Sequence, residues 1–379
     1  MGLRVRVLTQ LSEVEALTPA WNTLVEGSAS ATSFQTPAWC LAVMRNLFPE
    51  KPSRARIAVV EDGKGLILPA PLAIAARNGV RMLQWLGEPL SAYGDVVARP
   101  GCDVAAVMQQ VLDHMQARGD QIDVVYLPKT RVDATVTPFL KKFERLPSTN
   151  KIAPLIDLRR FPDFEAYVAS RSSKAMKSYR RKRRRLAEEG NLDFRVHSSG
   201  RHAAELARVA FDLKIQWMKT HGKVSRIFAH PAFLDALLDF VGQEGSGAFV
   251  SALSLDDHPI ALEIGFAINR CYYSYLGAMD LAFSRFSPGQ LQLLESLRWS
   301  FENGIETFDF LPSDSEYKRA WAPESTEQSD WIFACSYKGA LYGKLVLNSV
   351  LPLSRRLYTR APLSVRKPTQ SMIHRLLKE

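Results

Sequence analysis

One order of predicted elements occurs twice in this chain, and this repeat limits the fold more than any other feature. In each half, two helical segments precede a pair of apolar strands joined by a tight turn, EDGKG in the first half and DDHP in the second. A strand, a helix and a short strand then follow. Short echoes support the parallel, because YLGAMD matches WLGEPLSAYGD and FDFLP matches VVYLP. The sequence therefore predicts an α/β fold, a mixed sheet flanked by helices, built as two copies of one module.

The length agrees with two modules, because a chain of 379 residues that is 46% hydrophobic can bury two cores. We place the seam near residues 145–160. The expected domains are 1–150, 151–340 and a basic C-terminal tail at 341–379. The four cysteines lie too far apart for a zinc or redox motif and are too few for a disulfide scaffold. No metal-ligand spacing occurs, so we expect no metal.

The sequence contains no run of roughly 18 consecutive apolar residues, the length that a membrane-spanning helix needs. The first residues, MGLRVRVLTQLSEVEAL, lack the long apolar stretch of a secretory signal. Both observations favour a cytoplasmic protein. The tail mixes apolar and basic residues, so peripheral association with the inner face of the cell membrane is a further expectation, and a packed terminal helix is the alternative.

The net charge of +10 is concentrated in two segments. Nine of the fifteen residues at 171–185 are basic and none is acidic, and the tail after Leu341 adds eight cations against Glu379. Such segments attract polyanions, including nucleic acid, anionic lipid, a phosphorylated glycan carrier and acidic polysaccharide. We therefore expect an anionic partner.

The basic segment at 171–185 has the pattern of a helix, because Met176, Tyr179 and Leu186 form a narrow apolar stripe. Its cations repel one another unless an anion binds, and Arg181 and Arg184 are our candidates for contact with that anion. A solvated helix face is the alternative.

The stretch SRFSPGQLQ at 284–292 lies between a predicted strand and a predicted helix. The first N–H groups of a helix have no partner within it and the helix dipole is positive there, so such a turn is a candidate phosphate site. Pro288 suits an early helical position and Gly289 permits close approach of a ligand. Ser287 can cap the helix and Arg285 can add charge. An ordinary capped helix start is the alternative.

Glu263 lies on a strand face that otherwise carries small residues, because the large side chains of IALEIGFA all point to the other face. If residues 269 and 270 form a two-residue hairpin, Glu263 lies opposite Leu276 and diagonal to Ser274 and Ala278. A carboxylate in such a groove can have a raised pKa and accept a proton from an attacking amine. An ion pair with an arginine at the domain seam is the alternative.

The strand, RFSPGQL, the next helix and FDFLPSDSEYKRAWAPE together resemble the GNAT N-acyltransferase superfamily. The likeness is to its double-GNAT branch, which contains CelD-like proteins and the FemABX peptidyltransferases. It extends over nearly the whole chain, including SFQTPAWCLAV, WLGEPLSAYGD and the basic stretch before LAEEGNLDF. The resemblance implies tandem GNAT-like domains with the donor site in the second domain. It also implies transfer of an acyl group from acyl-CoA, such as acetyl-CoA, to an amine or a hydroxyl.

The resemblance assigns the turn before the helix to the donor. In GNAT enzymes the corresponding turn binds the pyrophosphate of acyl-CoA and has an R/QxxGxG/A pattern. Only Arg285 fits that pattern here, because proline and glutamine occupy the positions of small residues. FemABX relatives take aminoacyl-tRNA instead, so both donors stay open. The candidate donor-binding residues are Arg285, Phe286, Ser287, Pro288, Gly289, Gln290 and Leu291.

The resemblance also assigns the chemistry to three residues. Glu263 corresponds to the strand glutamate that serves as the base, and Tyr317 to the tyrosine that protonates the leaving thiolate. Lys318 is expected to steady the oxyanion or a donor phosphate. The alternatives are a packed aromatic ring and a solvated lysine.

Three residues of the first half are candidates for an acceptor groove at the seam, namely Trp85, Tyr93 and Asp95. The alternative is a core tryptophan and a turn aspartate.

Three functions stay open. The first is acyl transfer from a small acyl-CoA donor to an amine or hydroxyl of a sugar or cell-envelope polysaccharide precursor, an anionic glycan or a lipid-linked acceptor. The second is a FemABX-like transfer that uses aminoacyl-tRNA, for which tRNA would be the partner. The third is a non-catalytic accessory protein of a polysaccharide synthase, which would use its basic segments to dock.

Overall fold

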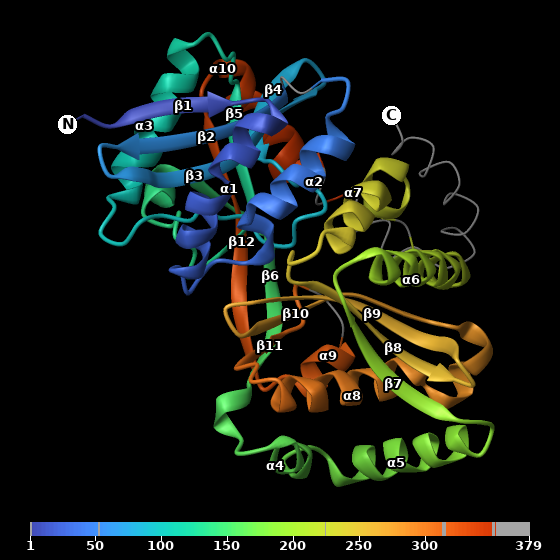
Figure 1. Ribbon diagram of the computed structural model, residues 1–379. Coiled ribbons are helices and arrows are strands. Elements are labelled where there is room, and N and C mark those ends of the chain that lie inside the picture. The colour runs from blue at the N-terminus through green and yellow to red at the C-terminus, as the bar shows by residue number, and fades with distance from the viewer. Residues whose placement is uncertain (1, 52–53, 224, 313–315, 351–352, 354–379) are drawn as a thin grey trace. The chain divides into compact units, whose positions relative to one another are not determined.

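The computed structural model describes residues 2–51, 54–223, 225–312, 316–350 and 353 (Figure 1). Its contacts divide the chain into two compact units. The first unit holds the residues up to Ile152 and the segment that begins at Thr326, and the second spans Ala153–Ser325. The chain therefore returns to the first unit, a feature absent from the expected division into 1–150, 151–340 and 341–379. Most of that expected tail lies outside the described residues.

The sheet of the first unit has five strands that neighbour one another in chain order. They are β1 (Arg4–Leu8), β2 (Ala55–Asp62), β3 (Gly65–Arg77), β4 (Val80–Trp85) and β5 (Val124–Arg131). Neighbours are antiparallel except β4 and β5, which are parallel because α3 (Val104–Ala117) returns the chain to the same end of the sheet. A late strand, β12 (Glu324–Ala334), adds antiparallel to β5. The helices before β2 are α1 (Leu11–Glu26) and α2 (Pro37–Leu47).

The second unit repeats this plan. Its strands are β7 (Leu192–Ser198), β8 (Ala248–Leu255), β9 (His258–Ile268), β10 (Cys271–Met279) and β11 (Thr307–Asp309). Among the strand pairings described for this unit, those of β7 to β10 are antiparallel, and β10 and β11 are parallel because α8 (Pro288–Glu302) joins them; β6 (Glu144–Asp157) adds antiparallel to β11. Its other helices are α4 (Phe164–Ala169), α5 (Ser173–Ala187), α6 (Arg201–Thr220), α7 (Pro231–Gly242) and α9 (Glu316–Trp321). The repeated order of elements confirms the predicted mixed α/β fold built from two similar modules.

Short helical segments complete the described chain. They are the 3₁₀ turns η1 (Ser33–Gln35), η3 (Phe139–Lys142), η4 (Leu158–Arg160), η5 (Arg226–Phe228) and η6 (Leu281–Phe286), the helix α10 (Tyr337–Tyr342) and the π-helix η7 (Gly343–Val350). Among the helices in the described ranges, none combines the length and apolarity needed to cross a membrane.

Two layers of helices cover the sheet of the second unit. Figure 1 shows α6 and α8 on opposite sides of strands β8 to β10, and both helices contact these strands. The large residues of β9 face the α6 and α7 side, where the rings of Phe240 and Phe266 lie 5.2 Å apart. The small residues and Glu263 therefore face α8.

The turn between β9 and β10 is the predicted two-residue hairpin, with Asn269 at φ 48° and Arg270 at φ 58°. The predicted pairing of Glu263 with Leu276 is wrong, however. The register shifts by one residue between Ser274 and Leu276, so Glu263 lies opposite Gly277. A β-bulge of this kind adds one residue to one strand, and the residues of the turn do not predict it.

Candidate functional site

A carboxylate is buried under α8 in the second unit. Glu263 is 6% exposed, and the hydroxyls of Tyr272 and Ser274 donate to its two carboxylate oxygens. Burial raises the pKa of Glu263, because the charged form loses water, while the two hydroxyls and the positive charge of Lys318 lower it. Burial is the largest cause, so the pKa is raised overall.

Helix α8 extends this cluster with polar side chains on its buried face. Gln292 Nε2 donates to the carbonyl of Ser251 at 3.1 Å and to its Oγ at 2.6 Å, and the Oγ of Ser296 lies 3.4 Å from that of Ser251. Gln292 and Ser296 are 3% and 1% exposed. Buried polar groups are costly unless they are hydrogen-bonded, so this network favours a defined arrangement around Glu263.

The surface beside the buried carboxylate is open. Gly277, the register partner of Glu263 on β10, is exposed, and a Cβ atom added there would meet no heavy atom within 4 Å. Directly opposite residues of two strands point to the same face, so this space adjoins Glu263 on the α8 side.

The opening coincides with a divergence of strands. Pairing between β10 and β11 covers only Cys271–Tyr273, whereas pairing between β10 and β9 continues to Met279. A ligand can therefore approach the β10 backbone beyond Ser274, the carboxyl-terminal end at which parallel strands commonly bind ligands.

Two lysines reach backbone carbonyls at this divergence. Lys214 of α6 donates to the carbonyl of Gly277 at 3.0 Å, and Lys318 of α9 donates to the carbonyl of Phe310 at 2.8 Å. Burial lowers the pKa of Lys318 to about 8, opposed by the carboxylate of Glu263 and reinforced by the charge of Lys214. The structure thus brings Lys318 near Glu263, two of the three residues predicted to carry the chemistry. The side chain of the third, Tyr317, lies outside the described residues.

The start of α8 combines positive charge with a strained residue. Ser287, the residue before the helix, has φ 54° and ψ 53°, and its side chain caps no backbone group. Its Oγ instead accepts a hydrogen bond of 2.7 Å from Lys182 of α5. The N–H groups of Gln290 and Leu291 donate to the carbonyl of Ser287 at 2.9 and 3.4 Å, so these amides already have an acceptor within the turn.

The other predicted donor residues have ordinary structural contacts. Arg285 pairs with Glu189 at 2.9 Å and lies 4.6 Å from the ring of Phe286, which is buried. Pro288 is the first residue of α8, and a Cβ at Gly289 would meet only the sulfur of Met279, at 3.9 Å. Close approach of a ligand at Gly289 is therefore sterically open.

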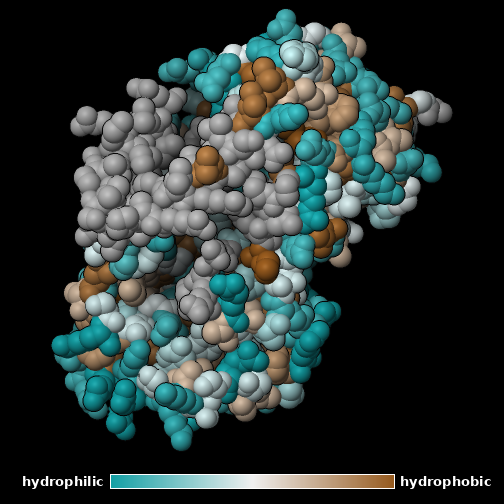
Figure 2. All heavy atoms as spheres, turned by 180° about the vertical axis from the view of Figure 1, so that it is seen from behind, coloured by the Kyte–Doolittle hydropathy of each residue, from teal (hydrophilic) through white to brown (hydrophobic). Residues whose placement is uncertain are grey.

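Helix α5 carries the basic segment, and Met176 and Leu186 are buried on its inner side as predicted. Figure 2 shows hydrophilic residues gathered at the lower end of the second unit, where α5 lies. Arg184 pairs with Glu188 at 3.8 Å, whereas no ion pair is recorded for Arg181 within the described part of the chain. The exposed cations of the helix are Lys174, Lys177, Arg180, Arg181, Arg183, Arg184 and Arg185.

The three candidates of the first half lie inside the first unit. Trp85, Tyr93 and Asp95 are 2%, 1% and 4% exposed. The indole of Trp85 donates to the carbonyl of Pro128 at 3.0 Å. The carboxylate of Asp95 accepts three backbone N–H groups, those of Val96, Thr135 and Val136, and burial raises its pKa to about 7. Their role in an acceptor groove stays a prediction.

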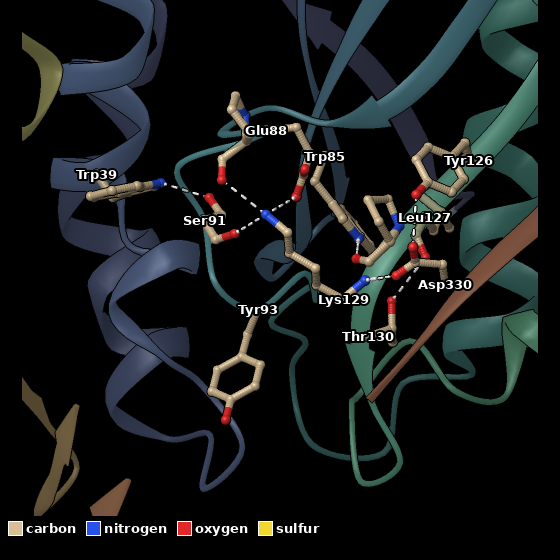
Figure 3. Close-up of polar contacts among 12 residues, drawn as sticks. Trp39, Trp85, Glu88, Ser91, Tyr93, Tyr126, Leu127, Lys129, Thr130 and Asp330 are labelled. Atoms are coloured by element: carbon tan, nitrogen blue, oxygen red, sulfur yellow. Dashed lines mark hydrogen bonds and ion pairs between the residues drawn. The ribbon is translucent and has the colours of Figure 1, made fainter. Parts of the chain in front are cut away.

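A lysine that the sequence did not single out fixes the loop around these residues (Figure 3). The ammonium group of Lys129 donates to the carbonyls of Pro89 and Ser91 at 2.9 and 2.7 Å and pairs with Glu88 at 3.1 Å. Its backbone N–H donates to Asp330 at 2.9 Å. These hydrogen bonds and the ion pair account for the conformation of the loop after β4.

The first unit serves as an internal comparison. Leu72 precedes its hairpin turn by the same number of residues as Glu263 precedes the second turn. Leu72 lines a small apolar cavity under α3, together with Leu83, Met108, Leu127 and neighbouring apolar residues. The same position is therefore apolar in one unit and ionisable in the other, so only the second unit offers this carboxylate.

Several polar residues near Glu263 were not predicted from the sequence. Gln292, Ser296 and Ser300 recur every fourth residue, and this polar stripe on a buried helix face was visible in the sequence. Lys182 and Lys214 reach the site from α5 and α6, and no local pattern predicts where those helices pack. No cluster of metal-binding side chains is found among the described residues.

Residues 173–319 match a family model described as an acetyltransferase (GNAT) domain. This segment contains Glu263, the turn before α8 and Lys318. No curated protein sequence matches the chain.

Solved structures resemble the chain in fold. A structure of FemX has a TM-score of 0.62 at 12% identity, covering 91% of this chain and 100% of that one. The C-terminal domain of a putative lysylphosphatidylglycerol synthetase from Agrobacterium fabrum has a TM-score of 0.52 at 12% identity, covering 90% and 97%. L-PGS from Bacillus licheniformis has a TM-score of 0.52 at 14% identity, covering 86% and 98%.

Proposed function

We propose that this chain, whose residues 173–319 match the acetyltransferase (GNAT) domain model, transfers an acyl group from acyl-CoA to an amine, or to a hydroxyl, of a sugar or cell-envelope polysaccharide precursor. The observation that carries this proposal is the buried carboxylate of Glu263 beside the open surface of Gly277, where β10 and β11 diverge.

Glu263 is the proposed base. A carboxylate with a raised pKa accepts a proton well near neutral pH, directly or through one water. As the amine nitrogen attacks the acyl carbonyl, the proton leaves the nitrogen for Glu263 and the carbon–sulfur bond breaks. Tyr317 is the proposed donor of the proton that the thiolate requires, and Lys318 stabilises the negative charge that develops on oxygen.

The start of α8 is the proposed phosphate site of the donor. The positive end of the α8 dipole and the ammonium of Lys182, which bonds Ser287, lie together at this helix start and repel one another unless an anion binds, whereas Arg285 already pairs with Glu189 and adds a cation that an anion could share. Pyrophosphate supplies that charge, and Gly289 leaves room for it. Gln290 and Leu291 contribute little through their N–H groups, because these already donate to Ser287.

Binding to immobilised CoA tests the donor. We expect the protein to be retained and released by free CoA, and a Lys182→Gln, Arg285→Gln double variant to be retained several-fold less. The matched control is Arg183→Gln, which removes a cation of α5 that pairs with Glu295 instead. Absence of retention by the unmodified protein contradicts an acyl-CoA donor.

A mass search tests the acceptor. Cell-envelope precursors extracted from wild type and from a deletion strain are compared for an acyl or aminoacyl adduct. We expect an acyl adduct that disappears on deletion and stays absent when Glu263→Gln is supplied. If Glu263→Gln and Tyr317→Phe both restore cellular function fully, a non-catalytic accessory role replaces the proposal.

A second candidate donor is aminoacyl-tRNA, favoured by the exposed cations of α5. Lys174, Lys177 and Arg181 follow one another at helical spacing, and no ion pair is recorded for them within the described ranges. Changing Arg180, Arg181, Arg184 and Arg185 together to glutamine should then weaken RNA binding strongly and reduce the dependence of the remaining affinity on salt. No RNA binding at low salt by the unmodified protein removes this candidate.

A further inference from the structure

Lys214 is a cation at the candidate site that the proposed chemistry does not use. It is half-buried on α6, its ammonium bonds the carbonyl of Gly277, and it lies 4.9 Å from the ring centre of Trp217. Burial lowers the pKa of Lys214. No ion pair is recorded for it among the residues that the structure describes.

Lys318 is the second cation at the same opening. Lys214 donates to a carbonyl of β10, and Lys318 donates to the carbonyl of the residue that follows β11. The two ammonium groups therefore lie one at each of the two strands that diverge. Burial lowers the pKa of Lys318 most, and the positive charge of Lys214 lowers it further. Two like charges at one opening cost free energy unless an anion lies between them.

The carboxylates nearby are already engaged. Glu263 accepts from Tyr272 and Ser274, and Asp309 accepts the backbone N–H of Leu311 at 2.7 Å. Both act on Lys318, and neither is paired with Lys214. An ammonium group has three N–H donors, and one recorded bond leaves Lys214 with donors for a ligand.

We propose that the divergence of β10 and β11, edged by the carbonyls of Gly277 and Phe310, is a subsite for an oxyanion, in which Lys214, together with Lys318, binds a carboxylate or phosphate group of the substrate. This inference rests on the proposed transferase function and narrows its substrate class. The substrate carries a negative charge close to the group that reacts, as an amino acid, an amino sugar acid or a phosphorylated amino sugar does. Binding in a half-buried place strengthens such a pair relative to one in bulk water.

Competitive labelling of lysines in the unmodified protein tests the subsite. A trace amine-reactive reagent is applied at pH 8, and the labelling rate of each lysine is measured by mass spectrometry with and without inorganic phosphate or malonate. We expect either anion, at saturation, to slow labelling of Lys214 and Lys318 at least about fivefold. Lys219, an exposed lysine on the same helix, is the control and should label at an unchanged rate.

The two probes separate the sources of the anion. Protection by phosphate alone assigns a phosphate group, protection by malonate alone assigns a carboxylate, and both support the subsite. Unchanged labelling of Lys214 with both anions overturns it, as does protection confined to Lys182 at the start of α8.

A variant gives an independent measurement. Lys214→Met keeps an unbranched chain against Trp217 and removes the charge, so we expect the anion-dependent rise in Tm to fall by half or more, with Lys219→Met behaving as the unmodified protein. An equal rise in both variants contradicts the inference. If the protein is retained on immobilised CoA but anions do not protect Lys214, the subsite is contradicted and the proposed transferase function stands. If anions protect Lys214 but no acyl transfer occurs, the subsite stands and the transferase function is contradicted.

Discussion

At Glu263, burial and hydrogen bonding act on one carboxylate in opposite directions. Loss of water raises its pKa, and the hydroxyls of Tyr272 and Ser274 hold its oxygens in place while lowering the pKa by less. A purely structural acid would gain from pairing with a cation inside the same cluster, whereas Lys318 donates to the carbonyl of Phe310. This arrangement supports the proposed role of Glu263 as the proton acceptor.

Glu263→Gln removes the proton acceptor while keeping the shape of the side chain. The amide oxygen still accepts from one hydroxyl, so we expect Tm to change by only a few degrees. Acyl transfer should fall about 10²-fold or more, because general-base assistance contributes roughly that factor. Steady-state rates and thermal unfolding check this, with Glu295→Gln on α8 as the control. Near-normal activity of the Gln variant would exclude a base at this position.

Gly277→Val fills the opening without disturbing the sheet. A Cβ there meets no atom within 4 Å, so the fold should tolerate it, and loss of glycine restricts the unfolded chain. We expect unchanged or slightly raised Tm together with a large loss of acyl transfer. Gly265→Val is the contrasting variant, because its Cβ would lie 2.5 Å from the ring of Phe249 and should destabilise the protein. Full activity of Gly277→Val would place the substrate elsewhere.

Lys318 should make the free energy of unfolding increase with pH between about pH 8 and pH 10.5. Its pKa is about 8 in the folded protein and 10.5 as the ordinary value, so between these pH values the unfolded chain binds more protons. The contribution of Lys318 therefore destabilises the fold below pH 8, and stability rises as pH increases towards 10.5. Lys318→Met should remove this rise in the free energy of unfolding, measured by denaturant titration at several pH values. An identical pH dependence in both proteins contradicts the assignment.

At the scale of elements, α5 places a positive charge at the positive end of α8, although Arg183 and Glu295 form an ion pair farther along the same two helices. Lys182 bonds Ser287 at the start of α8, where the helix dipole is also positive. This arrangement is unfavourable for the protein without a ligand and favourable for an anion, as the proposed donor site requires.

Lys182→Met distinguishes the effect of Lys182 on the stability of the free protein from its effect on CoA binding. Removing a cation from the helix start should stabilise the free protein or leave Tm unchanged, because such a contact is worth about 0.3–1 kcal/mol. The same variant should bind CoA more weakly and lose part of the Tm rise that CoA produces. Thermal unfolding with and without CoA measures both. A variant that is less stable alone and unchanged in CoA binding would show that Lys182 is only structural.

The site could be predicted from the sequence as far as local patterns reach. The two-residue hairpin, the face of Glu263, the helix start at Pro288 and the inner side of α5 follow from alternation, turn residues and helical spacing. The one-residue bulge before Leu276 does not, since it depends on packing across the sheet. Lys214 belongs to α6, and no local sequence pattern predicts where α6 packs.

At the scale of the whole molecule, two units share one order of elements but differ in the chemistry of corresponding positions. The position of Glu263 is occupied by Leu72 in the first unit, next to an apolar cavity. The starts of the crossover helices differ too. Asp103 caps α3 by accepting the N–H of Ala106, so a negative charge lies where α8 has Lys182 nearby. The two units therefore share a fold, but the first unit does not have the side chains of the candidate site at the corresponding positions.

This difference predicts that each chain binds one molecule of CoA. The carboxylate of Asp103 repels a phosphate and already uses an amide at the start of α3, whereas Lys182 and Arg285 attract one at α8. Isothermal titration should give a stoichiometry of one CoA for each chain, and Asp103→Asn should leave it unchanged because an asparagine can still accept the N–H of Ala106 at this helix start. Two equivalent sites in the unmodified protein would contradict the assignment of the donor to the second unit alone.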